Sequence, residues 1–236
     1  MLTAAPRIDV IEVSRITALP DFHPEAGAGF AGFPVHVFLV HHPDGPILVD
    51  TGVGFGNDII DEWYRPRTLD LRAELEARNV DPDGALTIIN THLHFDHCGQ
   101  NLALSAATIV VQRTEEAAAT APFYSVDEWA RLPADRTRLV DGNVDVAEGV
   151  SVIHTPGHTP GHQAVVVRSN AETVVIAGQC IFRAAEWTDA DPSSANLHDE
   201  AHRRAAADSL ARLRALSPTR VLLSHDTGFT PQQRTP

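Results

Sequence analysis

The stretch Thr91-His92-Leu93-His94-Phe95-Asp96-His97 constrains this chain most, because it gathers three imidazoles and a carboxylate at the end of an apolar run. His92 and His94 are two positions apart, so in an extended segment both side chains point to the same side. Asp96 and His97 follow where the strand expected over residues 85–90 turns into a helix, so they are free to surround a second position. Imidazole nitrogen and carboxylate oxygen are donors that zinc accepts. The stretch therefore predicts a site for one or two metal ions.

Three further segments also carry histidine or aspartate side chains that could take part in a metal site. They are Asp50-Thr51-Gly52, the repeat-like residues 155–162 (TPGHTPGH) and Ser224-His225-Asp226. With these motifs, in this order and spacing, the chain resembles the metallo-β-lactamase-fold hydrolases from about residue 35 to residue 228. The resemblance implies an α/β fold, the αβ/βα four-layer sandwich, in which residues 1–236 form a single domain.

The resemblance also implies roles for individual residues. Asp50 would lie behind the ligands and orient a ligand histidine, which fixes the tautomer of the ring. His154 and His162 would form hydrogen bonds rather than bind metal. The implied ligands are His92, His94 and His158 for the first metal, and Asp96, His97 and His225 for the second.

Two positions depart from the family pattern. Where most hydrolytic members carry an aspartate that bridges both metals, this chain has Gln179. An amide oxygen can bind one cation, but without a charge it offsets little of the repulsion between two, so Gln179 should weaken the second site. Cys180 is the alternative ligand there, and its other interpretation is a small buried side chain. Phe182 stands where lactonases of the family tend to have a tyrosine.

Among family members, the chain most resembles the N-acyl-homoserine-lactone lactonases, through HLHFDHCGQN and TPGHTPGHQ. The resemblance implies a zinc-dependent hydrolase in which metal-bound hydroxide attacks an ester, lactone or thioester carbonyl. Asp96 would accept a proton from the attacking water and protonate the leaving group. Two alternatives remain: an oxidoreductase or dioxygenase with a single iron (Fe²⁺), and a catalytically impaired metal-binding member.

Composition narrows the class of partner. A formal net charge of −13 opposes binding to nucleic acid or to an anionic membrane, so we expect a small-molecule substrate. All 18 basic residues are arginine, which excludes a lysine-dependent mechanism. The chain has only 2 cysteines, and neither an apolar run long enough to span a membrane nor a secretory leader is visible. We therefore expect a cytoplasmic protein, and the family resemblance adds a homodimer.

Hydrophobic periodicity places the motifs on elements. Residues 20–34 read as a loop, which either borders the site, as the family resemblance implies, or is a surface loop whose phenylalanines pack down. Residues 120–133 read as part of a substrate wall or as a helical hairpin. His198 and His202 share a helix face, and a solvated face explains them better than a metal pair. Helices are expected over residues 68–79 and 196–216, and strands over residues 7–19, 35–41, 46–50, 85–90, 108–112, 144–146, 150–154, 163–167, 173–177 and 220–224.

Overall fold

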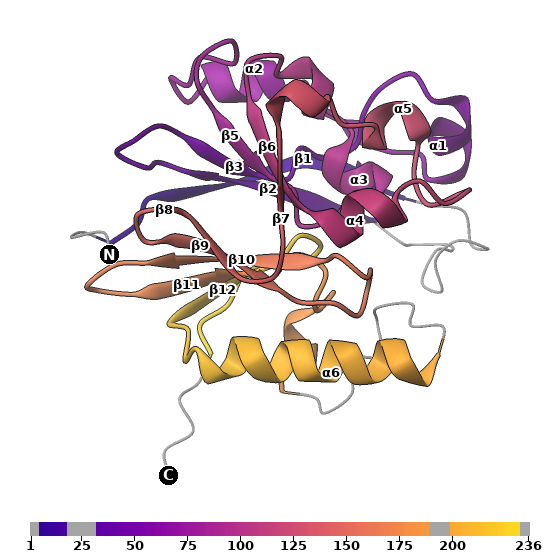
Figure 1. Ribbon diagram of the computed structural model, residues 1–236. Coiled ribbons are helices and arrows are strands. Elements are labelled where there is room, and N and C mark those ends of the chain that lie inside the picture. Colours follow the sequence, from indigo (N-terminus) through magenta and orange to yellow (C-terminus); the bar gives the residue numbers. More distant parts are fainter. Residues whose placement is uncertain (1–4, 18–31, 189–198, 232–236) are drawn as a thin grey trace. The chain divides into compact units, whose positions relative to one another are not determined.

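This computed structural model describes residues 5–17, 32–188 and 199–231. All strands of these residues belong to two sheets (Figure 1). The chain divides into two units, each described by itself. The amino-terminal unit comprises Ile8–Val110 and Ala119–Arg138. The carboxy-terminal unit comprises Met1–Arg7, Val111–Ala118 and Leu139–Pro236. The expectation of a single domain over residues 1–236 stays a prediction.

The first sheet has seven strands in the order β4-β1-β2-β3-β5-β6-β7. β1, β2 and β3 pair antiparallel, whereas β3, β5 and β6 are parallel neighbours. The central strands are buried, as expected for a sheet whose strands read as continuous apolar runs. The strand bounds are β1 Ile8–Ile16, β2 Phe33–Val40, β3 Ile47–Val49, β4 Arg67–Thr68, β5 Thr87–Ile89, β6 Thr108–Gln112 and β7 Thr137–Val140.

Four short helices belong to the amino-terminal unit, among which α2 covers the sheet. They are α1 Asp58–Trp63, α2 Leu71–Glu76, α3 Phe95–Cys98 and α5 Asp127–Ala130. The Asp70 side chain caps α2 by accepting the backbone N–H of Arg72. Leu71 and Leu75 are fully buried in a core with Leu48 and Ile88 of the strands beneath. The motif residues follow these strands, with Asp50 after β3 and the histidine-rich stretch after β5.

The second sheet lies in the carboxy-terminal unit and has the order β12-β11-β10-β9-β8. Only β11 and β12 are parallel. Figure 1 shows α6, Glu200–Ala215, running along this sheet. Leu210 and Leu213 of α6 pack in a core with Val166 and Val221. The other helix and the strands of this unit are α4 Arg113–Ala118, β8 Val144–Ala147, β9 Val150–His154, β10 Gln163–Arg168, β11 Thr173–Ile176 and β12 Arg220–Leu222. The described residues also form three short 3₁₀ helices, η1 Asn101–Ala103, η2 Ala134–Arg136 and η3 Ala184–Trp187.

Most of the elements expected from periodicity are present with shifted ends. The strand expected over 108–112 has the predicted bounds, and the helix expected over 68–79 is shorter because Asp70 caps it and Asn79 has a φ of 60°. β4, β7, α1 and α4 were not predicted, since each is short and carries little periodicity. Of the loop expected over residues 20–34, residues 20–31 lie outside the described residues. His198 lies outside them as well. The α/β fold class is confirmed.

Candidate metal centre

Strand register brings Asp50 next to the histidine-rich stretch. β3 and β5 are parallel, with Val49 opposite Ile89, so the residues that follow both strands emerge side by side. The backbone N–H of Asp50 donates to the carbonyl of Ile89 at 3.0 Å. In return, the backbone N–H of Thr91 donates to Oδ1 of Asp50 at 2.7 Å. Asp50 has a φ of 61°, a conformation that aspartate tolerates better than most residues.

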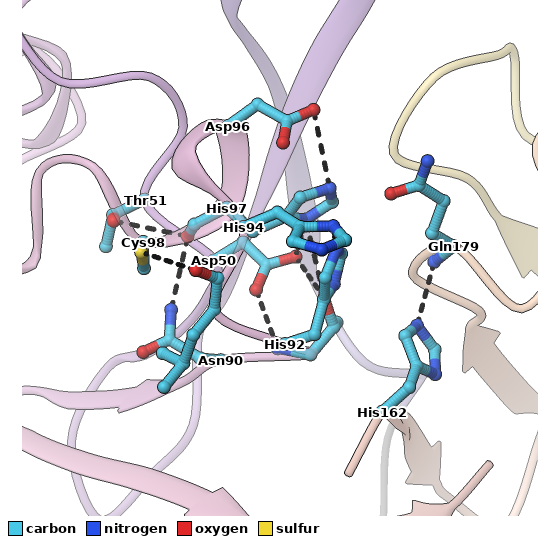
Figure 2. A network of polar contacts seen from close by, with 12 residues as sticks. Asp50, Thr51, Asn90, His92, His94, Asp96, His97, Cys98, His162 and Gln179 are labelled. Atoms are coloured by element: carbon cyan, nitrogen blue, oxygen red, sulfur yellow. Dashed lines mark hydrogen bonds and ion pairs between the residues drawn. The ribbon is translucent and has the colours of Figure 1, made fainter. Parts of the chain in front are cut away.

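The buried carboxylate of Asp50 fixes two imidazoles (Figure 2). Its Oδ2 lies 2.8 Å from Nδ1 of His97 and accepts the hydroxyl of Thr91 at 2.8 Å. Because this hydroxyl donates to Asp50, it accepts from Nδ1 of His92, 3.0 Å away. Both rings therefore carry their proton on Nδ1. The lone pair of each ring lies on Nε2, and a histidine whose Nδ1–H is held in this way can bind a metal through Nε2.

His92 and His94 lie close enough to share one ion. Nε2 of His92 is 3.0 Å from Nδ1 of His94, and the ring planes are nearly perpendicular at 82°. Burial, opposed by the charge of Asp96 and assisted by His97, lowers the pKa of His94 to about 4. The ring is thus neutral at neutral pH, and a neutral imidazole is the form that binds a metal.

Asp96 and His97 form the second group on α3. Oδ2 of Asp96 lies 3.7 Å from Nε2 of His97, and the Asp96 side chain is 10% exposed. Tyr64 packs on Phe95 with ring centroids 4.4 Å apart. Burial, and then the negative charge of Asp96, raises the pKa of Tyr64, so its hydroxyl stays protonated beside the carboxylate. Asp96 is therefore a partly accessible carboxylate next to the imidazole of His97, a candidate metal ligand.

A buried amide network anchors the backbone of α3 and was not predicted from the sequence. The carbonyl of His97 accepts the backbone N–H of Thr51 at 2.8 Å and Nδ2 of Asn90 at 3.1 Å. Nδ2 of Asn101 donates to the side-chain Oδ1 of Asn90 at 2.8 Å, and Oδ1 of Asn101 accepts from the hydroxyl of Thr51 at 2.9 Å. Such a network is rigid because each buried polar group finds a partner. The only sequence signal was the asparagine at each end of the motif.

Gly99 lets α3 approach the turn that follows Asp50. A Cβ built on Gly99 would lie 2.1 Å from the backbone nitrogen of Gly54 and 2.8 Å from the carbonyl oxygen of Gly52. Both are backbone atoms, so no side-chain rotation relieves the overlap. The Gly99 N–H also donates to the Gly52 carbonyl at 2.8 Å. The two segments are therefore locked at a distance that only glycine permits.

Gly99→Ala is accordingly expected to lower the free energy of unfolding by about 3 kcal/mol, because overpacking against backbone forces the two segments apart. The matched control is Gly56→Ala, since a Cβ at Gly56 meets nothing within 4 Å and only the φ of +79° opposes it. The control should cost about 1 kcal/mol. Urea unfolding of both variants measures the difference, and equal losses would contradict the close-approach argument.

In the carboxy-terminal unit, His158 lies on the loop between β9 and β10. Two of its neighbours on this loop, Thr159 and Gly161, donate to the fully buried carboxylate of Glu115 at 2.6 and 3.1 Å. Glu115 was not predicted, because a glutamate in the first turn of a short helix normally reads as a surface residue. His154, half-buried, lies 3.0 Å from the carbonyl of Pro160 through its Nε2, as expected of a hydrogen-bonding residue.

The side chain of Gln179 has the chemistry of a metal ligand. Its side-chain Oε1 is buried and has no hydrogen-bond partner among the described residues. A buried amide oxygen of this kind costs free energy unless something binds it, and a cation is a suitable partner. Gly178 before it has a φ of 57°, which makes the turn that presents the side chain. The residues at this position thus fit an oxygen ligand for a metal ion.

Cys180 turns the other way. It packs in the apolar core with Trp187 and Leu213, and burial raises the pKa of its thiol to about 12. This packing in the apolar core fits the interpretation of Cys180 as a small buried side chain. Nearby, the ring of Phe182 stacks on that of the buried His225 with centroids 4.6 Å apart and an angle of 25°.

The segment 120–133, expected to be a substrate wall or a helical hairpin, contains a single short helix, α5. Tyr124 places its ring 4.9 Å from that of His94, and Trp129 packs against the core of the amino-terminal unit. The segment is thus folded onto the histidine-rich stretch and is no hairpin. His202, the described member of the expected histidine pair, lies 2.8 Å from Asp199 at the start of α6.

This chain is similar to a known protein family and to proteins of known activity. Residues 31–225 match the family model described as the Metallo-beta-lactamase superfamily. An N-acyl homoserine lactonase from Bacillus sp is 34% identical to this chain over 155 residues. The match covers 61% of this chain and 62% of the relative, so it spans less than two thirds of the relative's length.

Solved structures are similar over a larger share of the chain. One is a B. thuringiensis protein with N-decanoyl-L-homoserine at its active site, with a TM-score of 0.78, 26% identity, and coverage of 95% of this chain and 94% of that one. Another is an N-acyl homoserine lactone hydrolase with the product N-hexanoyl-L-homoserine at its catalytic metal center. Its TM-score is 0.77 at 26% identity, covering 95% and 94% of the two chains. No helix in the described part of the chain is long and apolar enough to cross a membrane.

Proposed function

Because the chain belongs to the metallo-β-lactamase superfamily, we propose that it is a metal-dependent hydrolase that opens the lactone ring of N-acyl homoserine lactones. The observation that carries the proposal is the Asp50 carboxylate, which holds His97 directly and His92 through Thr91, so that the lone pair of each ring lies on Nε2. The named similarity to lactonases and to a lactone hydrolase with product at its metal center supports the substrate class.

In the amino-terminal unit, we propose His92 and His94 as ligands of one ion and Asp96 and His97 as ligands of the other. The family pattern also assigns ligand roles to His158, His225 and Gln179 of the carboxy-terminal unit, with the Oε1 of Gln179 as an oxygen ligand. Within the amino-terminal unit, ligand atoms of His92 and His94 lie within 4.8 Å of each other, and so do those of Asp96 and His97. Nitrogen-rich sites with carboxylate oxygen favour zinc, and we propose Zn²⁺ as the metal.

A bound cation supplies acidified water and polarisation of the lactone carbonyl. The protein's own part begins at Asp96, whose carboxylate oxygen takes a proton from the attacking water as the new carbon–oxygen bond forms. The ring carbon–oxygen bond then breaks, and Asp96 returns the proton to the leaving alkoxide, giving an acyl homoserine. The hydroxyl of Tyr64 stays protonated, because burial and the charge of Asp96 raise its pKa.

Gln179 sets this chain apart from a site with a bridging carboxylate. Two cations about 4 Å apart repel each other, and a neutral amide does not offset that repulsion. We therefore propose that the second ion binds more weakly than the first. The same neutrality favours the second candidate function, an oxidoreductase or dioxygenase with a single Fe²⁺, which the metal identity would distinguish.

Metal content tests the proposal first. Elemental analysis of protein purified without added metal is expected to find zinc, with one ion per chain tightly held and a second one lost on dialysis. In Gln179→Asp the second ion should be retained, because the carboxylate adds the missing charge. Gln179→Asn, which has the size of aspartate without its charge, is the matched control and should hold no more metal than the wild type.

Turnover of a panel of acyl homoserine lactones completes the test. Ring opening in metal-loaded protein, lost with a chelator and restored by Zn²⁺, is the expected result. One iron per chain without lactone turnover would contradict the hydrolase proposal and support the oxidoreductase. Two bound zinc ions without turnover of any lactone, ester or thioester would identify a catalytically impaired member of the family. A cytoplasmic location and a homodimer stay predictions.

A further inference from the structure

The loop that carries His158 is held on two sides by buried contacts within the carboxy-terminal unit. On one side, the hydroxyl of Ser209 on α6 donates to the carbonyl of Pro156 at 2.7 Å. A Cβ built on Gly157 would lie 2.6 Å from the Cα of Ala206, so the loop touches the helix backbone. On the other side, Glu115 of α4 accepts two hydrogen bonds from the loop, as described above. The conformation of the loop is therefore fixed by its surroundings.

His162 ends this loop, and both of its ring nitrogens are engaged by the protein. The ring is fully buried. Nδ1 lies 3.2 Å from the carbonyl oxygen of Thr155 and 2.8 Å from its hydroxyl. Nε2 accepts the backbone N–H of Gln179 at 3.0 Å (Figure 2). Since a backbone N–H can only donate, Nε2 must carry the lone pair, and the proton is on Nδ1, where both the hydroxyl and the carbonyl of Thr155 can accept it.

This arrangement joins two segments that are separate in sequence. Thr155 begins the loop with His158, and its N–H donates to the carbonyl of His162 at 2.8 Å, which closes the loop. Gln179 follows β11, and its backbone N–H donates to the imidazole of His162. The pairing of β10 with β11 brings the two segments near each other, and the ring adds a direct link from the end of the His158 loop to the backbone of Gln179.

We propose that His162 is a positioning residue that presets Gln179 relative to the His158 loop, so that both side chains are ready for metal ions before any ion binds. The inference rests on the proposed function, because it takes His158 and Gln179 as ligands. Outer residues that orient metal ligands typically change metal affinity by about 10- to 100-fold when they are replaced. The effect should be largest for the more weakly bound ion, to which Gln179 contributes.

Two substitutions separate the two nitrogens of the ring. In His162→Asn, the amide can replace the Nδ1 donor to Thr155 but is too short to reach the N–H of Gln179. In His162→Gln, the longer side chain can place its Oε1 near the position of Nε2 and accept from Gln179. We expect the affinity for the second zinc ion to fall at least about 10-fold in His162→Asn and to stay within about 3-fold of the wild type in His162→Gln.

The readout is a chelator-competition titration of zinc and the visible absorption spectrum of the cobalt-substituted protein, neither of which needs turnover. Ser209→Ala is the matched control, because it removes a buried contact of the same loop without touching Gln179. It should lower the unfolding temperature and leave the cobalt spectrum of the second ion unchanged. Equal affinities in the two His162 variants, or equal losses in both and in Ser209→Ala, would overturn the proposal.

A second measurement covers the case in which a His162 variant does not fold. Nitrogen NMR of the metal-free wild type should find the His162 ring protonated on Nδ1 and not on Nε2, and the reverse tautomer would overturn the proposal. A wild type that binds no metal would overturn both this inference and the proposed function. Two-ion binding with the expected variant pattern but no lactone turnover would overturn only the proposed substrate.

Discussion

Asp96→Asn is expected to lower kcat for lactone hydrolysis by roughly 10²- to 10⁴-fold, the range typical of a lost general acid–base group. The asparagine oxygen can still contact a cation, but it cannot take up the proton of the attacking water or return it to the alkoxide. Steady-state kinetics on metal-loaded protein measure the loss, and elemental analysis of the same sample separates a missing proton carrier from a missing ion.

Asp58→Asn is the control for this change. Asp58 also lies in the first turn of a helix of the amino-terminal unit, but it is exposed and contacts no histidine of the motif among the contacts described. Its loss should leave kcat within about 2-fold, since surface substitutions rarely do more. An Asp96→Asn variant that keeps its metal and most of its kcat would remove Asp96 from the catalytic role.

Asp50→Asn should have the second large effect, although Asp50 touches no substrate. An amide nitrogen in place of Oδ2 would face two donors, Nδ1–H of His97 and the hydroxyl of Thr91. The conflict is relieved if the His97 proton moves to Nε2, which then occupies the lone pair proposed for the ion. Metal affinity should fall about 10- to 100-fold, and the free energy of unfolding by about 1–3 kcal/mol.

Asp9→Asn provides the matched control. Asp9 and His41 form another aspartate–histidine pair of the same unit, with Oδ2 and Nε2 2.8 Å apart, and neither is a proposed ligand. Zinc affinity from chelator competition should be unchanged in this variant. If Asp50→Asn binds zinc as tightly as the wild type does, the carboxylate does not set the tautomer of His97.

Much of this fold could be read from local sequence, and the exceptions have a common cause. β6 and β9 were predicted with their observed bounds because apolar residues and turn residues mark both ends. β4 has two residues and exists only because it pairs with β1 around Ser14 and Thr68. Such a strand is specified by its partner, so no periodicity within it could have indicated it.

The site divides in the same way. The histidines of the motif could be named as candidate ligands from their spacing alone, whereas the orienting role of Asp50 was implied by the family resemblance of Asp50-Thr51-Gly52. Glu115 could not, since its burial depends on a loop more than forty positions later, whose Thr159 and Gly161 donate to it. Cys180 remained an alternative ligand until its neighbours were known, because adjacent residues of a turn point to different sides and the sequence does not say which.

The parallel register of β3 and β5 has a consequence for how such a protein changes over evolutionary time. Asp50 and Thr91 meet because two strands end at the same level, so an insertion or deletion inside either strand would separate the carboxylate from its imidazoles. The turn at residues 42–45, which precedes β3, lies outside that constraint, as do residues 81–84 before β5. Surface loops accept length changes at little energetic cost. Length changes in such a chain are therefore expected in its loops, where they leave the contact between Asp50 and Thr91 intact.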